Sequence, residues 1–355
     1  MNKKLTLFLI LTLIFFTVDG AKAQEVWKLL SNENYNSQKK ETYQKKNFPR
    51  AYKLLSLEID SFNENLKKTG KQTPVVIQLP NDKGDLQQFY LTETSNFDEA
   101  LQQKYPNIKS YTAQGIDDPT AIAKLSLGTD GFHGVIFSAK HETIYIDPYS
   151  KDNRDYIAYK RSSLSKIDED FKCQVEDSFK NDFSFSSLHK NADDGKLRTF
   201  RLALVCSGEY AQFHLGASQQ NIPSSASDAV KKAAVLSAMN TSITRINGIF
   251  EKDLAVKLEI VANNDEIIFL DPASDGITDG DPDDMIDEVQ TICDNVIGNA
   301  NYDIGHVFSV GGDGLAGLGV VCVTGQKARG VTGRSQPVGD PYDIDFVVHE
   351  LGHQF

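Results

Sequence analysis

The sequence predicts a mostly β domain followed by an α/β domain. Short alternating apolar runs fill residues 73–159, a polar stretch interrupts the pattern at 160–195, and strand and helix patterns alternate after it. Consecutive strands joined by turns indicate a β domain, whereas strand–helix alternation is typical of an α/β sheet. A chain of 355 residues also suits two domains of about 100–200 residues each. We expect the boundary between residues 195 and 196.

The first residues form a separate targeting segment. Lys3 and Lys4 precede an uncharged apolar run from Leu5 to Val18, and an Ala-x-Ala pattern ends at Ala23. This arrangement is typical of a secretory signal peptide, and the apolar run is shorter than the roughly 20 residues that a membrane span needs. We therefore expect residues 1–23 to be removed and the mature protein to be secreted, without a stable membrane span.

Residues 24–195 carry β-type patterns. Runs such as PVVIQL, QQFYLTE and FHGVIFS alternate apolar and polar residues, and Gly, Pro, Asn and Asp separate them, which predicts strands joined by turns. An amphipathic stretch at 51–66 predicts a short helix or a strand pair. Residues 160–195 are polar, as is typical of a linker.

From residue 197 the patterns alternate. RTFRLALVCS and LAVKLEIVA predict strands, and the apolar spacing over 226–249 between them predicts a helix. A second helix is expected to begin at Asp281-Pro282, because aspartate caps helices and proline suits the first helical position. Asp340-Pro341 predicts the start of the last helix in the same way. DIGHVFSV and GLAGLGVVCV predict two further strands.

The composition narrows the possible partners. A net charge of −12 argues against nucleic acid, whose binding depends on clustered Lys and Arg. Four cysteines are too few for a disulfide scaffold in a chain this long. The acidic residues 271–284 suggest either a calcium site or a solvated loop, and they lack the glycine and terminal glutamate positions of an EF-hand.

The strongest motif is HELGH, residues 349–353, which fits H-E-x-x-H. Residues four apart share one face of a helix, so His349 and His353 can both bind one Zn²⁺. Zinc lowers the pKa of a bound water to about 7, and Glu350 is the expected general base that takes its proton during attack on a peptide carbonyl. The motif therefore predicts a zinc-dependent endopeptidase, and the alternative is an exposed polar helix without metal.

Several segments together resemble the secreted bacterial branch of the reprolysin-like (adamalysin-like) metzincin zinc metallopeptidases. They are GLAGLGVVC, NYDIGHVFS, KARGVTG and GDPYDIDFVVHELGHQF, and upstream IQLPNDKGDLQQF, YPNIKSYTAQGIDDPTA and IYIDPY. The resemblance implies a catalytic α/β domain with a mixed twisted sheet at 196–355 and a propeptide at 24–195. The chain is thus expected to be a zymogen that acts on proteins or peptides.

The resemblance also implies an edge strand along which the substrate binds. A glycine-rich strand leaves its backbone accessible to an added strand, although glycine can equally serve tight packing. The expected edge residues are Gly314, Leu315, Ala316, Gly317, Leu318 and Gly319.

The metzincin pattern continues as H-E-x-x-H-x-x-G-x-x-H, and the sequence ends at Phe355, before that glycine. We therefore expect a C-terminally truncated domain, without its third ligand and without useful peptidase activity as a 355-residue product. Two alternatives stay open. One is a zinc hydrolase with a later glutamate as third ligand, and the other is a secreted binding or inhibitory protein without catalysis.

Cys173, in DFKCQVED, is a candidate latency ligand. In metzincins a propeptide thiolate can occupy the fourth zinc position, and soft sulfur binds zinc well. The residues around Cys173 depart from the known switch motifs, so an ordinary free or paired cysteine is the alternative.

Four other residues have expected roles. Reprolysins pair the cysteine at the position of Cys322 with one after the zinc motif, and Cys293 is an alternative partner. Cys206 lies within an apolar strand and is expected to be a buried small residue. His306 is expected to be a core histidine rather than a replacement ligand.

Overall fold

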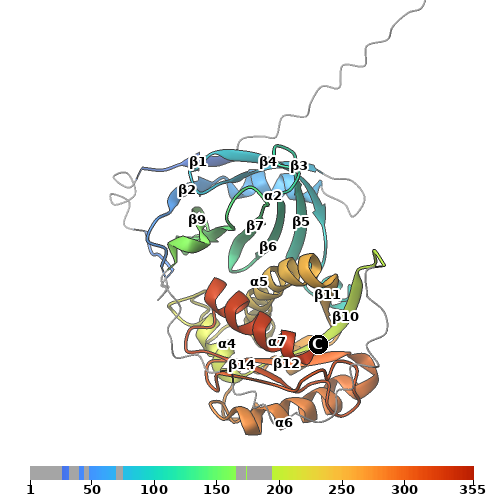
Figure 1. The fold of residues 1–355 in the computed structure, drawn as a ribbon. Helices are drawn as coiled ribbons and strands as arrows, with labels where there is room; N and C mark the ends of the chain where they lie inside the picture. The colour runs from blue at the N-terminus through green and yellow to red at the C-terminus, as the bar shows by residue number, and fades with distance from the viewer. Residues whose placement is uncertain (1–25, 32–39, 44–47, 69–74, 165–172, 174–193) are drawn as a thin grey trace, which may run out of the picture.

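The computed structural model describes residues 26–31, 40–43, 48–68, 75–164, 173 and 194–355 (Figure 1). The expected signal peptide and most of the expected linker lie outside the described residues. Nothing in the described part of the chain forms a helix long and apolar enough to cross a membrane.

The N-terminal part is one antiparallel sheet, which confirms the expectation of a mostly β region. Its strand order is β1-β2-β9-β8-β7-β6-β5-β4-β3. The strands are β1 (Trp27–Leu29), β2 (Lys53–Leu57), β3 (Val75–Pro80), β4 (Leu86–Glu93), β5 (Lys109–Gly115), β6 (Ile122–Gly128), β7 (Gly131–Phe137), β8 (Ile144–Pro148) and β9 (Asp155–Lys160). Helices α2 (Ile59–Lys67) and α3 (Glu99–Lys104) and the short 3₁₀ turn η1 (Arg161–Ser163) accompany them.

The N-terminal sheet has its own core. The amphipathic stretch 51–66 forms strand β2 followed by helix α2, whose Phe62 and Leu66 are buried. Phe62 packs edge-on against Trp27 and Phe132. Aromatic rings in this arrangement add to the stabilisation that apolar burial provides, so α2 is held on the sheet by its apolar face.

The C-terminal part is a mixed sheet in the order β11-β10-β12-β14-β13, as predicted for this α/β region. Only the edge strand β13 is antiparallel to its neighbour. The elements are β10 (Arg198–Cys206), α4 (Gly208–Leu215), α5 (Asp228–Leu254), β11 (Val256–Ile260), η4 (Asn264–Ile267), α6 (Pro282–Ile292), η5 (Cys293–Gly298), η6 (Asn299–Asn301), β12 (Ile304–Ser309), β13 (Gly314–Ala316), β14 (Gly330–Gly333), η7 (Pro341–Val347) and α7 (Val348–Gln354).

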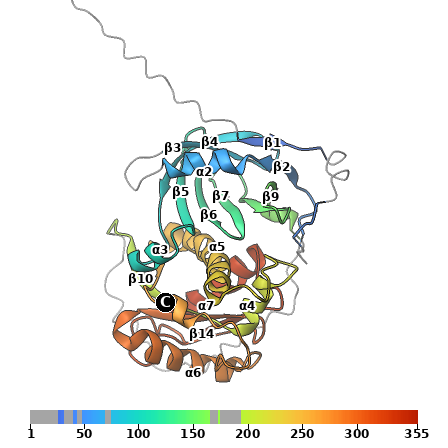
Figure 2. The same ribbon diagram turned by 180° about the vertical axis from the view of Figure 1, so that it is seen from behind.

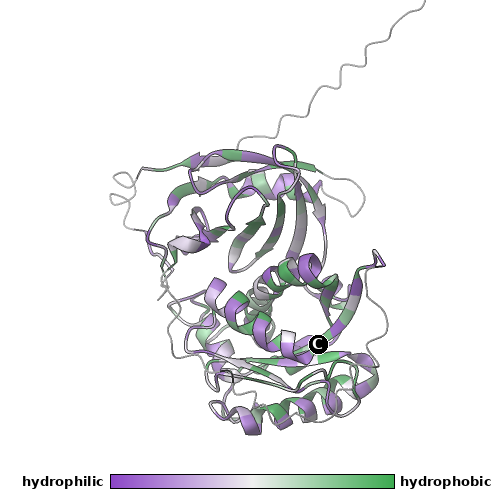
Figure 3. Ribbon diagram, viewed as in Figure 1, coloured by the Kyte–Doolittle hydropathy of each residue, from purple (hydrophilic) through white to green (hydrophobic). Residues whose placement is uncertain are grey.

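Helix α5 lies between the two sheets (Figures 1 and 2). Ser227 caps it by accepting a hydrogen bond from the Val230 N–H, so the helix starts close to the predicted position and runs five residues further than predicted, to Leu254. Hydrophobic and hydrophilic residues are mixed along α5 and α6 (Figure 3), as expected for helices whose two faces have different neighbours.

The predicted helix starts differ in their capping. The Asp281 carboxylate accepts hydrogen bonds from the Asp283 and Asp284 N–H groups, as the Asp-Pro pattern predicts. Pro341 does begin η7, which continues directly into α7, but Asp340 makes no capping hydrogen bond. The prediction of the same cap chemistry at Asp340 was wrong, because this carboxylate is bound by side chains of the N-terminal part instead.

The glycine-rich strand is shorter than predicted. Strand β13 ends at Ala316, so Gly317, Leu318 and Gly319 lie outside it. Gly319 has φ +62° and Cys322 φ +64°, and such left-handed conformations do not continue a strand. The Gly319 N–H donates to the His353 carbonyl instead, so the chain turns here toward the end of α7.

The acids of 271–284 serve the local structure. Asp275 is buried and accepts hydrogen bonds from the N–H groups of Gly208 and Ile277. Asp279 accepts hydrogen bonds from Ser309 and from the Gly311 N–H. Most of these contacts go to backbone N–H groups, so the acids hold this loop against α4 and β12.

Candidate metal centre

Helix α7 carries both histidines of the motif on one face. The Nε2 atoms of His349 and His353 lie 3.0 Å apart, and their ring centroids are 4.6 Å apart. Residues four apart on an α-helix are neighbours on its surface. The four-residue spacing in the sequence thus places the two imidazole rings close enough to bind one metal ion.

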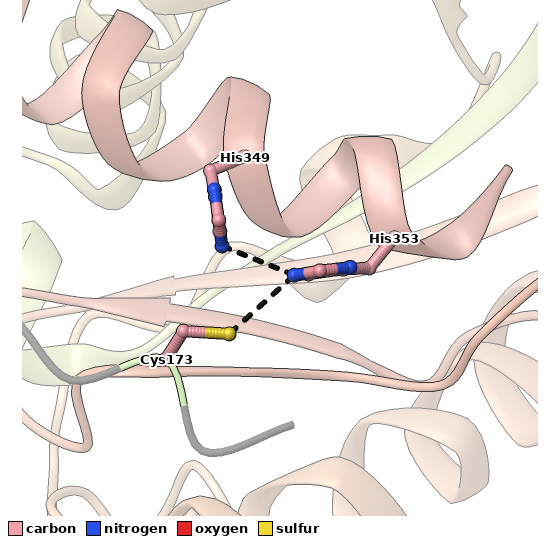
Figure 4. Close-up of side chains that lie close together, drawn as sticks. All are labelled: Cys173, His349 and His353. Atoms are coloured by element: carbon pink, nitrogen blue, oxygen red, sulfur yellow. Dashed lines mark hydrogen bonds between the residues drawn. The ribbon is translucent and has the colours of Figure 1, made fainter. Parts of the chain in front are cut away.

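Cys173 joins the two histidines from a segment 180 residues away (Figure 4). Its Sγ atom lies 3.4 Å from Nε2 of His353. One ligand atom from each of these three residues fits within a span of 4.8 Å, and within the described ranges this is the one such group of His, Cys, Asp or Glu. Cys173 also forms an isolated parallel bridge with Gly314, so it lies on the edge strand β13.

The donor set fits zinc. Tetrahedral Zn²⁺ has bonds of about 2.0–2.1 Å to nitrogen and about 2.3 Å to sulfur, so its ligand atoms lie roughly 3.3–3.6 Å apart. The 3.0 Å and 3.4 Å separations come within a few tenths of an ångström of this geometry. Two imidazoles and a thiolate are a combination that zinc accepts.

Glu350 is the buried acid beside this group. Its side chain is fully buried, and neither carboxylate oxygen has a hydrogen-bond partner among the described residues. Burial raises the pKa of Glu350 to about 7, and the nearby Cys173 thiol offsets this in part. A buried carboxylate without a partner is costly, so this placement indicates a function rather than a contribution to stability.

The last residue of α7 anchors the helix to the sheet. Gln354 accepts a hydrogen bond at Oε1 from the His306 ring, 2.9 Å away, and donates from Nε2 to the Gly305 carbonyl. The other His306 nitrogen lies 2.8 Å from the Thr332 hydroxyl, and burial lowers the pKa of His306 to about 4. His306 is therefore a neutral core histidine, as expected. The sequence did not single out Gln354, because a lone glutamine carries no motif.

The cysteines form no disulfide. Cys206 is buried, as expected for an apolar strand. Cys293 is buried while Cys322 is exposed, so the alternative pairing of these two is absent from the structure. All four cysteines are among the described residues.

One comparison with known protein families gives a match. Residues 236–355 match the family described as Metallo-peptidase family M12B Reprolysin-like. No curated protein matches the chain. Residues 236–355 are thus similar to zinc metallopeptidases of the reprolysin-like family. The cofactor of that family is zinc, and its substrates are proteins or peptides.

Proposed function

We propose that this chain is a secreted zinc-dependent endopeptidase in its latent form. The observation that carries the proposal is the convergence of Cys173 with His349 and His353. In this proposal residues 24–195 are the propeptide and 196–355 belong to the catalytic domain, with residues 1–23 as the signal peptide.

Each residue of the centre has a defined role. His349 and His353 hold the metal through Nε2, and Gln354 fixes the end of their helix on β12. The chemistry that bound zinc supplies is acidification of water and polarisation of a carbonyl group. Apart from the nearby Cys173 thiol, no described residue competes for the Glu350 oxygens, so Glu350 can accept the proton of the attacking water as general base once that thiol has left.

Cys173 supports latency in two ways. Its Sγ atom takes a position that a ligand to the metal would hold, which keeps water from that position. Its backbone pairs with Gly314, so Cys173 also occupies the strand edge at the position where an extended peptide would pair. In this proposal the substrate reaches neither that position nor the centre while Cys173 is in place.

Zinc stoichiometry tests the proposal. The purified 355-residue chain, dialysed against a weak chelator, should hold about one zinc per molecule by atomic absorption, and His349→Ala with His353→Ala should hold almost none. Exposed His141 supplies the matched control, since His141→Ala should keep the metal. A wild-type chain without tightly bound metal would support the alternative of a secreted binding protein.

Cobalt substitution tests the role of Cys173 separately. Co²⁺ bound to a thiolate shows a charge-transfer absorption that imidazole ligands do not produce. We expect this band in the wild type and in Cys322→Ser, which changes another exposed cysteine. Its persistence in Cys173→Ser would show that Cys173 is not a ligand.

Export is tested by the N-terminus of the mature protein. When the whole chain is expressed with its own leader, the exported product should begin at Gln24, which Edman sequencing reads directly. A product that keeps Met1 and stays in the cells would contradict secretion.

A further inference from the structure

The segment that leads into α7 carries three aspartates that do not cap a helix. Asp340 is buried and accepts hydrogen bonds from the Tyr145 hydroxyl and from Nε of Arg161, 3.1 Å away. A second nitrogen of Arg161, Nη2, contacts the Asp345 carboxylate. Tyr145 lies on β8 and Arg161 on η1, so two side chains of the N-terminal part form hydrogen bonds with the start of this segment.

The third aspartate is held by a buried ion triad. Arg245 of α5 donates from Nη1 to Asp343 at 2.8 Å and from Nη2 to Asp147 of β8 at 2.5 Å. The Arg245 side chain is only 3% exposed. Ser242 adds a hydrogen bond of 2.6 Å to Asp343. One guanidinium thus joins a strand of the N-terminal sheet, helix α5 and the segment before the zinc motif.

Each part of the chain contributes both a cation and an anion to this contact. The N-terminal part contributes the cation Arg161 and the anion Asp147, and the C-terminal part contributes Arg245 and the aspartates of 340–345. Burial raises the pKa of Asp340, Asp343 and Asp345, because water no longer solvates their charge. The cations compensate the cost of burying these carboxylates. Removal of a cation would leave a buried carboxylate without its partner, so it should destabilise the packing of the segment.

Movement of this segment reaches the metal ligands directly. Helix η7 ends at Val347 and α7 begins at Val348 without a turn between them. Asp343 and His349 are six residues apart, which corresponds to roughly 9 Å along a helix. Cys173 contacts α7 at the imidazoles instead, so the two attachments touch different ends of this helical stretch.

We propose that Arg161 and Asp147 of the N-terminal part, with Arg245 and the aspartates of 340–345, form an ionic clamp that holds the zinc-motif helix separately from Cys173. The inference rests on the proposed function in treating the N-terminal part as a propeptide. It adds a second attachment of this part to the active-site helix. Latency then depends on two attachments, Cys173 and the ionic clamp. Loss of the thiol alone leaves the N-terminal part bound to the active-site helix through the clamp.

Hydrogen exchange measured by mass spectrometry tests the clamp in the full chain without zinc. Arg161→Ala should raise exchange in peptides covering residues 341–354 about two- to fivefold, since Arg161 is partly exposed and partly screened. Asp147→Asn, which loosens the buried triad, should raise it about tenfold or more. Cys173→Ser should leave it within twofold of the wild type.

Arg154→Ala is the matched control, because this exposed arginine lies in the N-terminal part, directly before β9, and makes none of the contacts of the clamp. Unchanged exchange in β5 and β6 will show that the variants are folded. The clamp is refuted if Arg161→Ala behaves like Arg154→Ala, or if Cys173→Ser loosens residues 341–354 as much as Arg161→Ala does. The hydrogen-exchange measurements do not require zinc. If the chain proved to bind no zinc, the proposed function would be overturned, but the exchange result for the clamp would remain valid.

Discussion

The two faces of α5 differ in chemistry, and the difference separates contacts that depend on apolar burial from contacts that water can replace. The face toward the five-stranded sheet is apolar and shares one core with β10, β11 and α7; its residues are Val235, Leu236, Met239, Ile243, Ile246 and Phe250. The face toward the nine-stranded sheet is polar and hydrogen-bonded; its residues are Ser237, Asn240, Thr241, Thr244 and Asn247.

The polar face suits a partner that can leave. Hydrogen bonds to neutral side chains can be exchanged for hydrogen bonds to water at a modest net cost. An apolar face of the same size would become an exposed hydrophobic patch, which promotes association. Water can therefore replace the polar contacts of α5 with the N-terminal sheet. Phe97, Leu101 and Ile108 of the N-terminal part, in contrast, lie in the apolar core that α5 shares with the five-stranded sheet.

The largest effect should come from the apolar face. Ile243→Ala removes a fully buried side chain from the core that α5 shares with α7. We expect a loss of about 2–5 kcal/mol in the free energy of unfolding, measured by urea denaturation of the full chain. If Ile243→Ala lowered the free energy of unfolding less than the polar-face variants do, the apolar face would not be the main source of stability of α5.

The next effect depends on pH and involves two buried histidines, one on β12 and one on α4. Burial lowers the pKa of His306 and of His214 to about 4, from an ordinary value near 6.5. Because the folded pKa is depressed, each histidine stabilises the fold above pH 6.5, and this stability is lost as pH falls from 6.5 toward 4. The loss is about 3 kcal/mol for each histidine.

Urea denaturation at pH 7 and pH 4.5 measures this loss. In His306→Gln the difference in stability between the two pH values should shrink by about 2–3 kcal/mol relative to the wild type. His214→Gln should shrink it similarly. An unchanged difference in both variants would show that the two rings are not held neutral by burial.

Asn96 tests the polar face from the N-terminal side. Its Nδ2 donates to Asn240 and Thr244, and its Oδ1 accepts from Asn247. Asn96→Ala leaves these buried partners without one bond each, which should cost about 1–3 kcal/mol. Hydrogen exchange should rise in β6 and α5 more than in β12. An equal rise in exchange in β6, α5 and β12 would mean that the interface between the two sheets does not open independently of the five-stranded sheet.

The smallest effect is expected at Lys124. Lys124 is buried beside Glu251 of α5, and burial lowers its pKa despite that partner. Lys124→Met combined with Glu251→Met replaces both charges of the pair by apolar side chains of similar shape, so the loss should stay within about 1 kcal/mol. A loss of more than about 3 kcal/mol would show that this ion pair, rather than the neutral hydrogen bonds, dominates the polar face.

Local patterns were sufficient for the elements that carry the motif. Apolar spacing predicted α5, and Asp281-Pro282 predicted the start of α6 with its cap. The four-residue spacing of His349 and His353 predicted their common face. These features depend on neighbours a few residues away, which the sequence shows directly.

The features that failed or were missed depend on distant contacts. The glycine-rich strand was predicted too long, because the turn at Gly319 is held by the His353 carbonyl. Asp340 has the sequence of a cap, but Arg161 and Tyr145 bind it from 179 and 195 residues away. The polar face of α5 was not predicted, because its partners lie on strands whose order the sequence does not show.

The bridge between Cys173 and Gly314 has a further consequence for handling the protein. An uncovered edge strand offers unpaired N–H and C=O groups to other molecules and can nucleate aggregation. Strand β13 is only three residues long, and Cys173 pairs with it at Gly314. Preparations that have lost Cys173 by cleavage should therefore lose colloidal stability first, and concentrated stocks will keep better as the uncleaved chain.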